Sequence, residues 1–557
     1  MKPSKIWPAS SLLLFTACAT VPPRPAAPVE VQLLAFNDFH GNLETPPPVE
    51  VTEADGTKAL ITSGGAAHLA SAIERLRQPN SVTVSAGDTI GASPLTSALF
   101  LDEPTIAAMN RIGLEFNAVG NHEFDKGVDE LKRMQAGGCA KYTARTPCAI
   151  EPFAGAGFRY LAANVVQPDG STVFPATGIK RFGKGRRAVT IGFIGMTLKD
   201  TANLVTPSGV KGLTFGDEAA TANALVPGLK AAGADSIVLL IHQGGKTPSF
   251  TRGNGCDGLY GGILSILDRL DPAIATVVSG HTHWAYVCNR ENRRLLTSAG
   301  KNGHYLTDIR LSFDPATRRL IGQRAINDIV GQGEQGGDAA VRQLVDRYVA
   351  AAAPLANKAV GSLTAEAPRD IDDAESPAAD LIADAMLDAT RKPDKGGAQI
   401  ALVNATGVRV ALPGGQVRYK DAFAMMPFGN NLVVISLTGA QLKSVVEQQY
   451  AIPLRARATR PAALAPSIGF AYAYDLGRPV GERIVTMTLE GKPVDPAARY
   501  RVVINNYLAS GGDGLSGFTA GTDVTDAGII DIDALIAWIA PGQTPPAANR
   551  VRDATKR

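Results

Sequence analysis

Short apolar runs alternate with helical patterns between residue 31 and about residue 328. The runs are rich in β-branched residues and lie at 31–36, 81–86, 116–120, 188–195, 235–241 and 275–280. Between the first two runs, residues 66–77 place Ala66, Leu69, Ala70, Ile73 and Leu76 at the spacing of one helix face. This alternation predicts an α/β domain in which helices cover a buried sheet.

A turn-rich segment at 331–337 ends this pattern, and mixed strand-like and helical patterns continue beyond it. Thr438 and Gln441 have the spacing of a capping box, which predicts a helix running from there through Gln449. The Ala- and Pro-rich residues 455–467 are expected to form a surface connection. We therefore expect a first domain at 30–330, a linker helix at 331–357 and a second, α+β domain at 358–550.

The N-terminus has the pattern of an export signal. Lys2 and Lys5 precede a short apolar run at 10–17, which is too short to span a bilayer. Cys18 follows in a context that resembles a bacterial lipoprotein cleavage box. The expected organisation is a lipoprotein signal peptide at 1–17 and a Pro-rich tether at 18–29, with Cys18 as the lipidated residue. The alternative is an ordinary signal peptide that contains a cysteine. An anchored protein would sit at the outer membrane, facing the periplasm or the cell surface.

Composition narrows the class of protein. The chain has 557 residues, 45% of them hydrophobic, which suits a folded protein of two or more domains and excludes a disordered chain. It carries 55 Lys and Arg against 52 Asp and Glu, a net charge of +3. With charges so balanced, a nucleic-acid polymer is not expected as the main partner, and the membrane is expected to be reached only through a lipid anchor. Oligomeric state is left open.

Four cysteines remain after Cys18, and they allow three disulfide pairings. Export to an oxidising compartment makes pairing plausible. Cys139 with Cys148 and Cys256 with Cys288 are the favoured pairs, because each brackets a single local unit. A zinc site built from all four thiolates would need tighter spacing.

Candidate chemistry is concentrated directly after the strand-like runs. The segments are NDFHGN (37–42), SAGDT (85–89), GNHEFD (120–125), IHQGG (241–245) and SGHTH (279–283). They contain five of the seven histidines, and the other two, His68 and His304, are expected to be structural. Ligands of open α/β sheets collect beyond the carboxyl ends of the strands, so these side chains are expected to meet in one place.

The residue types and spacing indicate a metal site. Asp38 and His40 are two residues apart, so in an extended segment both point to one side, and His281 and His283 repeat this spacing. Imidazole, carboxylate and amide donors suit Zn, Mn or Fe and not Ca. The donors suffice for two ions, with Asp88 as the natural bridge. Two divalent ions about 3.5–4 Å apart can stabilise both oxygens of a phosphoryl transfer.

The five segments, in this order, resemble those of the calcineurin-like metallophosphoesterases, and with the second half of the chain they resemble the 5′-nucleotidase family. The resemblance implies a four-layer α/β/β/α domain followed by an α+β nucleotide-binding domain. It implies two divalent ions (Zn, Mn or Co), one held by Asp38, His40, Asp88 and His283 and the other by Asp88, Asn121, His242 and His281. His122 resembles the catalytic histidine of the family and Asp125 its orienting carboxylate, whereas Glu123 is expected to brace the turn.

The second domain carries segments that resemble the nucleoside pocket of this family. Asn404 and Arg409 match an amide and a basic residue near the substrate, and Asp513 matches a residue near the ribose. Phe428 and Tyr507 match the two faces of an aromatic clamp, with Tyr507 where Phe is common. One position departs from the family: Asp372 stands where an arginine is usual, and Arg369 is a candidate substitute.

The function implied is dinuclear metal-dependent hydrolysis of nucleoside 5′-monophosphates through a metal-activated water, a reaction of nucleotide catabolism. UDP-sugars and 2′,3′-cyclic nucleotides are alternative substrates for the same chemistry. A different class, a non-catalytic nucleoside-binding surface lipoprotein, is the third alternative, but it would leave a complete set of metal ligands unused.

Overall fold

The protein is described by a computed structural model that covers residues 27–555 except 54, 144, 249–250, 291–293, 334–335, 370–374 and 452–463. The predicted signal peptide at 1–17, the lipidation site Cys18 and most of the tether at 18–29 lie outside these residues, as does Asp372. No helix among the described residues is both long and apolar enough to cross a membrane.

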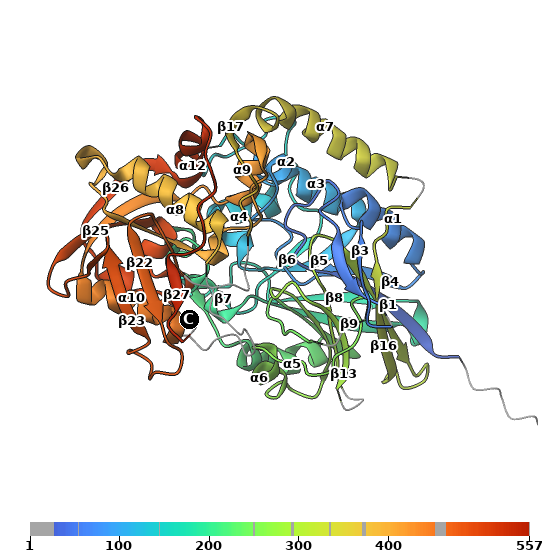
Figure 1. The fold of residues 1–557 in the computed structure, drawn as a ribbon. Helices are drawn as coiled ribbons and strands as arrows, with labels where there is room; N and C mark the ends of the chain where they lie inside the picture. Colours follow the sequence, from blue (N-terminus) through green and yellow to red (C-terminus); the bar gives the residue numbers. More distant parts are fainter. Residues whose placement is uncertain are drawn as a thin grey trace, which may run out of the picture.

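Two six-stranded sheets form the first part of the chain (Figure 1). The first sheet has, in spatial order, β16 (Leu320–Ile329), β15 (Tyr305–Phe313), β1 (Val29–Phe36), β4 (Ser81–Ser85), β5 (Leu114–Ala118) and β6 (Arg159–Leu161). The second has β13 (Ala285–Arg290), β14 (Arg294–Ala299), β12 (Ile274–Ser279), β11 (Ser236–Ile241), β9 (Val189–Met196) and β8 (Thr177–Phe182). Two short pairs accompany them, β2 (Val49–Thr52) with β3 (Lys58–Ile61) and β7 (Val165–Val166) with β10 (Thr214–Phe215).

The sheets pack face to face because their strands are apolar on both sides. Along β1, Leu33 and Ala35 enter a core shared with β9 of the other sheet, whereas Leu34 and Phe36 enter the core beneath the helices. Those helices are α1 (Ala66–Leu76), α3 (Glu103–Ile112), α4 (Val128–Ala136) and α7 (Ala339–Ala356), and the short α2 (Leu95–Ala98) contacts α3 and α7. The second sheet is covered by α5 (Glu218–Ala231) and α6 (Ile263–Leu267). This is the predicted four-layer α/β/β/α arrangement.

The second part of the chain has a five-stranded mixed sheet. Its order is β21 (Leu464–Pro466), β18 (Ile400–Asn404), β25 (Arg499–Asn505), β20 (Asn431–Thr438) and β26 (Thr522–Ile530). Around it lie α8 (Pro377–Thr390), α9 (Tyr419–Met425), α10 (Gly439–Ala451), α11 (Asn506–Ala509) and α12 (Asp531–Ile539). A second sheet joins β24 (Lys492–Pro493), β23 (Ile484–Leu489), β22 (Phe470–Tyr474) and β27 (Val551–Asp553), and β17 (Ala359–Leu363) pairs with β19 (Gly415–Arg418). The predicted α+β fold is confirmed.

The two parts share packed surfaces. Leu95 and Ala98 of α2 belong to the apolar core that α8, α9 and α12 form in the second part. Helix α7 packs on α1 and α3 and also contacts α9, so it lies across the junction in Figure 1. The junction is therefore partly apolar.

Several local predictions can be compared directly with the structure. The capping box is confirmed: the Thr438 N–H donates to Gln441 Oε1 at 2.8 Å, and the Gln441 N–H donates to Thr438 Oγ1 at 3.1 Å. Both favoured disulfides are present, Cys139–Cys148 and Cys256–Cys288. The expected surface connection at 455–467 is wrong at its end, because Leu464 and Ala465 are buried in β21 against β18.

The two disulfides close loops of different length, which predicts unequal contributions to stability. Cys139–Cys148 spans 9 residues and Cys256–Cys288 spans 32. Loop-closure entropy predicts that replacing the second pair with serine lowers the free energy of unfolding by about 1 kcal/mol more than replacing the first. Thermal melting of the two double variants under oxidising conditions measures the difference, and equal melting temperatures would contradict it.

Candidate metal centre and active site

Seven polar side chains meet at the carboxyl ends of parallel strands from both sheets. The pairings β1–β4–β5 and β9–β11–β12 are parallel, so the loops that follow these strands emerge at the same edge. Asp38 and His40 follow β1, Asp88 follows β4, Asn121 follows β5, His242 follows β11, and His281 and His283 follow β12. The sheets thus bring together residues that lie more than 240 positions apart.

The structure divides these side chains into two neighbouring groups. Ligand atoms of Asp38, His40 and His283 lie within 4.8 Å of one another, and so do those of Asp88, His242 and His281. Asn121 joins the second group, because its Oδ1 lies 3.1 Å from His281 Nδ1. Each group supplies the mixed nitrogen and oxygen donors that transition-metal ions prefer.

Asp88 stands between the two groups. Its Oδ2 lies 2.9 Å from His242 Nε2 and 3.8 Å from His40 Nε2, and its Oδ1 accepts the His122 N–H at 2.9 Å. A single carboxylate therefore faces both groups, which is the position expected of a bridging ligand.

Five of the seven residues have left-handed backbone conformations. The φ angles are 49° at Asp38, 47° at His40, 50° at Asp88, 69° at His281 and 61° at His283. The expectation that the D-x-H and H-x-H pairs are extended is therefore wrong. Hydrogen bonds hold the strained loop instead: the Asp38 N–H donates to Gly87 O and the His40 N–H to Asp88 O. Strain of about 1–3 kcal/mol per residue is typical of functional sites, and the surrounding structure must offset it.

Glycine is required where these loops cross. A Cβ on Gly120 would lie 2.1 Å from Asp88 Oδ1, and a Cβ on Gly91 would lie 2.1 Å from the His122 carbonyl oxygen. Both distances are far inside van der Waals contact, so a larger residue at either position would displace a predicted site residue.

The imidazoles are oriented to offer lone pairs to a cation. Nδ1 of His40 lies 2.9 Å from the Gly91 carbonyl oxygen, and Nδ1 of His242 lies 2.8 Å from the Ala86 carbonyl oxygen. Since a carbonyl only accepts, each Nδ1 carries a proton, and Nε2 is the nitrogen that faces the site. Burial disfavours charge on His242, but the Asp88 carboxylate outweighs it and raises the pKa of His242 to about 10. Nε2 of His40 then faces Nε2 of His283 at 3.2 Å, and Nε2 of His242 is buried with no well-directed hydrogen bond. The residues present therefore fit divalent metal ions.

In the group of Asp38, His40 and His283, burial also favours the neutral form of both histidines. It lowers the pKa of His40 to about 3, and it lowers that of His283 well below its usual value with help from the charges of His40 and Lys301. Both imidazoles are thereby kept in the neutral form that binds a cation. Burial raises the pKa of Asp38 to about 7, with a further contribution from Asp88 and against the lowering effect of His242.

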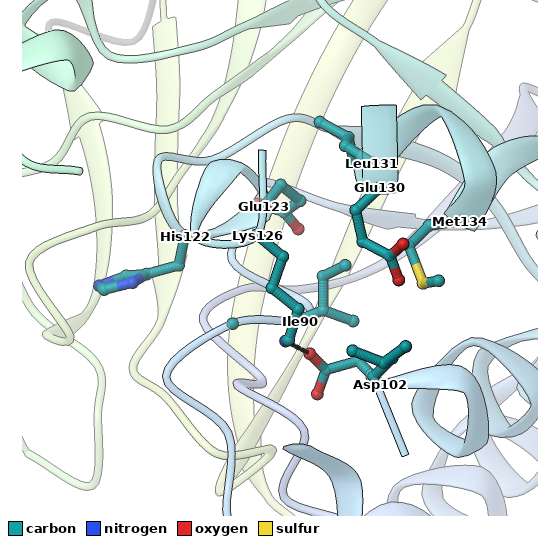
Figure 2. Close-up of a pocket in the computed structure, with 10 residues that line it drawn as sticks. Ile90, Asp102, His122, Glu123, Lys126, Glu130, Leu131 and Met134 are labelled. Carbon is teal, nitrogen blue, oxygen red and sulfur yellow. Dashed lines mark hydrogen bonds and ion pairs between the residues drawn. The ribbon is translucent and has the colours of Figure 1, made fainter. Parts of the chain in front are cut away.

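His122 lies beside the two groups on the short helix η1 (His122–Phe124). Its Nδ1 lies 2.9 Å from Asp125 Oδ2, and Asp125 also accepts the Ala92 N–H, so the imidazole is held in one orientation. Burial disfavours charge on His122, but the carboxylates of Asp125 and Asp88 outweigh it and raise the pKa. Figure 2 shows the ring directed away from the buried ion pair of Lys126 and Asp102, and it lies 5.2 Å from the His40 ring.

Glu123 is directed into the protein, where it ties two loops together. Its carboxylate accepts the backbone N–H of Asp88 at 2.9 Å, of Thr89 at 2.8 Å and of Gly120 at 2.7 Å. The carboxylate is buried and lies outside both candidate metal groups. It thus fixes the backbone of Asp88 relative to that of Asn121. These are the contacts expected of a residue that braces the turn.

The residues expected to bind substrate from the second domain border this centre. Phe428 stacks on His122 with ring centroids 6.0 Å apart, and the Arg409 guanidinium carbon lies 5.8 Å from the Phe428 centroid. Tyr507 is on α11, and its hydroxyl bonds to Asp513, whose other oxygen accepts from Asn404 and Thr406. Phe428 and Tyr507 thus have different partners in this structure.

The structure also identifies supporting residues that sequence patterns did not single out. Asn37 donates to Asp38 Oδ2 at 2.7 Å and to the Gly300 carbonyl at 2.7 Å, so it orients a candidate ligand. Its place in the NDFH segment was a usable signal. Nothing in the sequence marks Thr406 or Asn203 as neighbours of Asp513 and Tyr507. Arg369 is half-buried, and burial lowers its pKa to about 10 with a contribution from Arg409.

Comparison with known proteins agrees with this geometry. Residues 31–285 match the calcineurin-like phosphoesterase family, and residues 359–520 match the 5′-nucleotidase C-terminal domain. A probable 5′-nucleotidase of Treponema pallidum (strain Nichols) is 25% identical, over 95% of this chain and 94% of that protein. Endonuclease YhcR of Bacillus subtilis (strain 168) is 28% identical over 87% of this chain, which spans only 37% of the endonuclease. The crystal structure of a 5′-nucleotidase precursor from Thermus thermophilus superposes with a TM-score of 0.74 at 25% identity, covering 95% of this chain and all of that one.

The contacts of Glu123 predict that its loss empties the metal centre. Glu123→Ala leaves three buried N–H groups without an acceptor, each at a cost of about 1–3 kcal/mol, and frees the Asp88 loop. We expect metal content, measured by elemental mass spectrometry after dialysis, to fall well below that of the wild type.

Glu375→Ala is the matched control for this variant. Glu375 is a buried carboxylate that accepts the backbone N–H of Arg550 and Val551, far along the chain from every candidate ligand. Its loss should lower the melting temperature and leave metal content unchanged. Full metal content in Glu123→Ala would show that the loops hold their positions without it.

Proposed function

The chain belongs to the 5′-nucleotidase family of calcineurin-like phosphoesterases and is a hydrolase, and we propose that it releases phosphate from nucleoside 5′-monophosphates at a centre of two divalent ions. The observation that carries the proposal is the position of Asp88 between two buried groups of nitrogen and oxygen donors. The proposed organisation has a phosphoesterase domain at 30–330 and a substrate domain at 358–550, joined by residues 331–357. The proposal also includes export of the protein and lipidation at Cys18.

We assign the ligands as the family resemblance implies, and the two groups of neighbouring side chains support this assignment. Asp38, His40, Asp88 and His283 would hold one ion, and Asp88, Asn121, His242 and His281 the other, with Zn, Mn or Co as candidates. Bound there, two divalent ions would lower the pKa of a nucleophilic water and draw charge from the phosphoryl oxygens.

His122 is proposed to contact the phosphoryl group. Because Nδ1 is engaged by Asp125, the opposite nitrogen, Nε2, is the one available to donate to a phosphoryl oxygen. Arg409 is the second candidate donor, since its guanidinium lies against Phe428, which in turn covers His122. Both groups would stabilise charge that grows in the transition state.

The second domain is proposed to hold the nucleoside. Phe428 and Tyr507 supply aromatic surfaces for the base, and Asp513 with Asn404 supplies polar groups for the ribose. Phe428 stacks on the face of the His122 ring here, so it borders the path to Nε2, which donates in the plane of that ring. Phe428 and His122 come from different domains, so a rotation of one domain against the other near 331–357 would open this contact.

A substrate panel tests the proposed reaction. Purified protein supplied with Zn, Mn or Co should hydrolyse AMP to adenosine and phosphate faster than it cleaves UDP-glucose to UMP and glucose 1-phosphate or a 2′,3′-cyclic nucleotide to its monophosphate. Chromatography of the products follows all three reactions, and chelation should stop them until metal is added back. His122→Ala should lower turnover of AMP by about 10²–10⁴-fold with metal content unchanged. Full activity in that variant would remove His122 from the mechanism, and faster cleavage of UDP-glucose than of AMP would move the assignment to that substrate class.

The ligand assignment predicts unequal effects of two carboxylate variants. Asp38→Ala removes a ligand from one group only, so about one ion per chain should remain, whereas Asp88→Ala removes the shared ligand and should weaken both sites. Calorimetric titration with Zn or Mn measures the stoichiometry, with Asp495→Ala in an exposed turn as the control. Retention of two tight ions by Asp88→Ala would rule out a bridging role.

A further inference from the structure

The hydroxyl of Tyr507 joins the two halves of the molecule. Tyr507 Oη lies 2.8 Å from Asp513 Oδ1, 2.8 Å from the backbone nitrogen of Asp513 and 3.0 Å from the carbonyl oxygen of Asn203. Asn203 is the last residue of the short helix η3 (Lys199–Asn203), which belongs to the first part of the chain. A phenylalanine would make none of these three contacts.

One proton cannot serve all three partners. A phenol donates a single hydrogen and accepts through its oxygen lone pairs. The Asp513 N–H donates to Oη, but Asp513 Oδ1 and Asn203 O are both acceptors, and they compete for the one hydroxyl proton. The carboxylate is charged and 0.2 Å closer, so it holds the proton in the structure described, and the Asn203 carbonyl is only partly satisfied.

The surroundings hold Tyr507 and Asp513 in place. A Cβ on Gly512 would lie 2.5 Å from Tyr507 Cζ, so the backbone of Gly512 packs directly against the ring. Asp513 has a left-handed φ of 55°, and its Oδ2 accepts from Asn404 Nδ2 at 2.8 Å and Thr406 Oγ1 at 2.6 Å. Oδ2 thus has two side-chain donors, whereas Oδ1 receives the Tyr507 proton in competition with the Asn203 carbonyl.

We propose that the Tyr507 hydroxyl is a specificity-determining group that couples occupation of Asp513 by a sugar hydroxyl to the contact with Asn203. This inference rests on the proposed function, because it takes a nucleotide as substrate. A ribose hydroxyl that donates to Asp513 Oδ1 replaces the phenol as its donor. The phenol proton then turns to the Asn203 carbonyl, and the bond between the two domains strengthens only when a sugar is bound.

This coupling distinguishes substrates that stacking alone would not. Any aromatic group can stack on a tyrosine or phenylalanine ring, but only a ligand with a hydroxyl placed at Asp513 releases the phenol proton. Phosphate esters with a sugar would therefore be favoured over aryl phosphates of similar stacking area. Tyr507→Phe keeps the ring and removes this preference.

The kinetic test compares AMP with 4-nitrophenyl phosphate, which has no sugar. In Tyr507→Phe we expect kcat/KM for AMP to fall about three- to tenfold, the size of one or two lost hydrogen bonds, with less than a twofold change for the aryl ester. Tyr500→Phe is the matched control, because its hydroxyl accepts only the Asp495 N–H in a turn away from the centre. Equal losses on both esters, or no loss on AMP, would overturn the proposal.

Hydrogen exchange supplies a readout that does not depend on turnover. Adenosine should slow amide exchange in the peptide that covers 198–206 in the wild type, and in Tyr507→Phe it should bind without that protection. The same protection in both proteins would show that the hydroxyl is not the link. If adenosine fails to bind the wild type in calorimetry, the nucleoside site itself is refuted, which separates failure of the proposed function from failure of the coupling alone.

Discussion

Nitrogen and oxygen donor atoms that crowd together inside the protein set the main constraint on this structure. Nε2 of His40 lies 3.2 Å from Nε2 of His283, and Asp88 directs one oxygen toward both His40 and His242. Carbonyl oxygens at Gly91 and Ala86 accept the Nδ1 protons, so neither ring can turn its Nε2 away from the site without losing a hydrogen bond. A cation between these donors would bind them together, so the arrangement fits a metal centre better than core packing.

The scaffold must hold this arrangement against strain. Five of the seven candidate ligands have positive φ, a conformation that L residues avoid. Two devices oppose the strain: the loop after β1 is hydrogen-bonded along the loop after β4, and Glu123 accepts three backbone N–H groups from the loops after β4 and β5. Both depend on strands that are buried on two faces, because a loose strand would let the loops relax. The four-layer fold and the metal centre are in this sense one structure.

The sequence predicted the elements and the identity of the candidate ligands because both leave short-range signals. Apolar runs mark buried strands, and a histidine or aspartate directly after each run marks the sheet edge. The conformation of the ligand loops left no such signal. The D-x-H spacing predicts an extended pair, but φ is positive at both Asp38 and His40. Contacts between the halves were equally hidden, since the carbonyl of Asn203 and the hydroxyl of Tyr507 are 304 residues apart. Backbone carbonyls have no sequence signature, so only the folded chain reveals them.

The contacts between the two halves of the molecule connect its structure to the proposed function. The first half holds the metal centre and His122, and the second half presents Phe428, Arg409 and Tyr507 to it. In the structure described, these residues satisfy one another: Phe428 covers His122, and Tyr507 bonds to Asp513 and Asn203. A substrate that stacks on Phe428 or bonds to Asp513 must therefore exchange contacts, because both of these side chains already have partners. Such an exchange gives selectivity, since a ligand that replaces only one of these contacts leaves the other group without its partner, whereas a nucleotide can replace both.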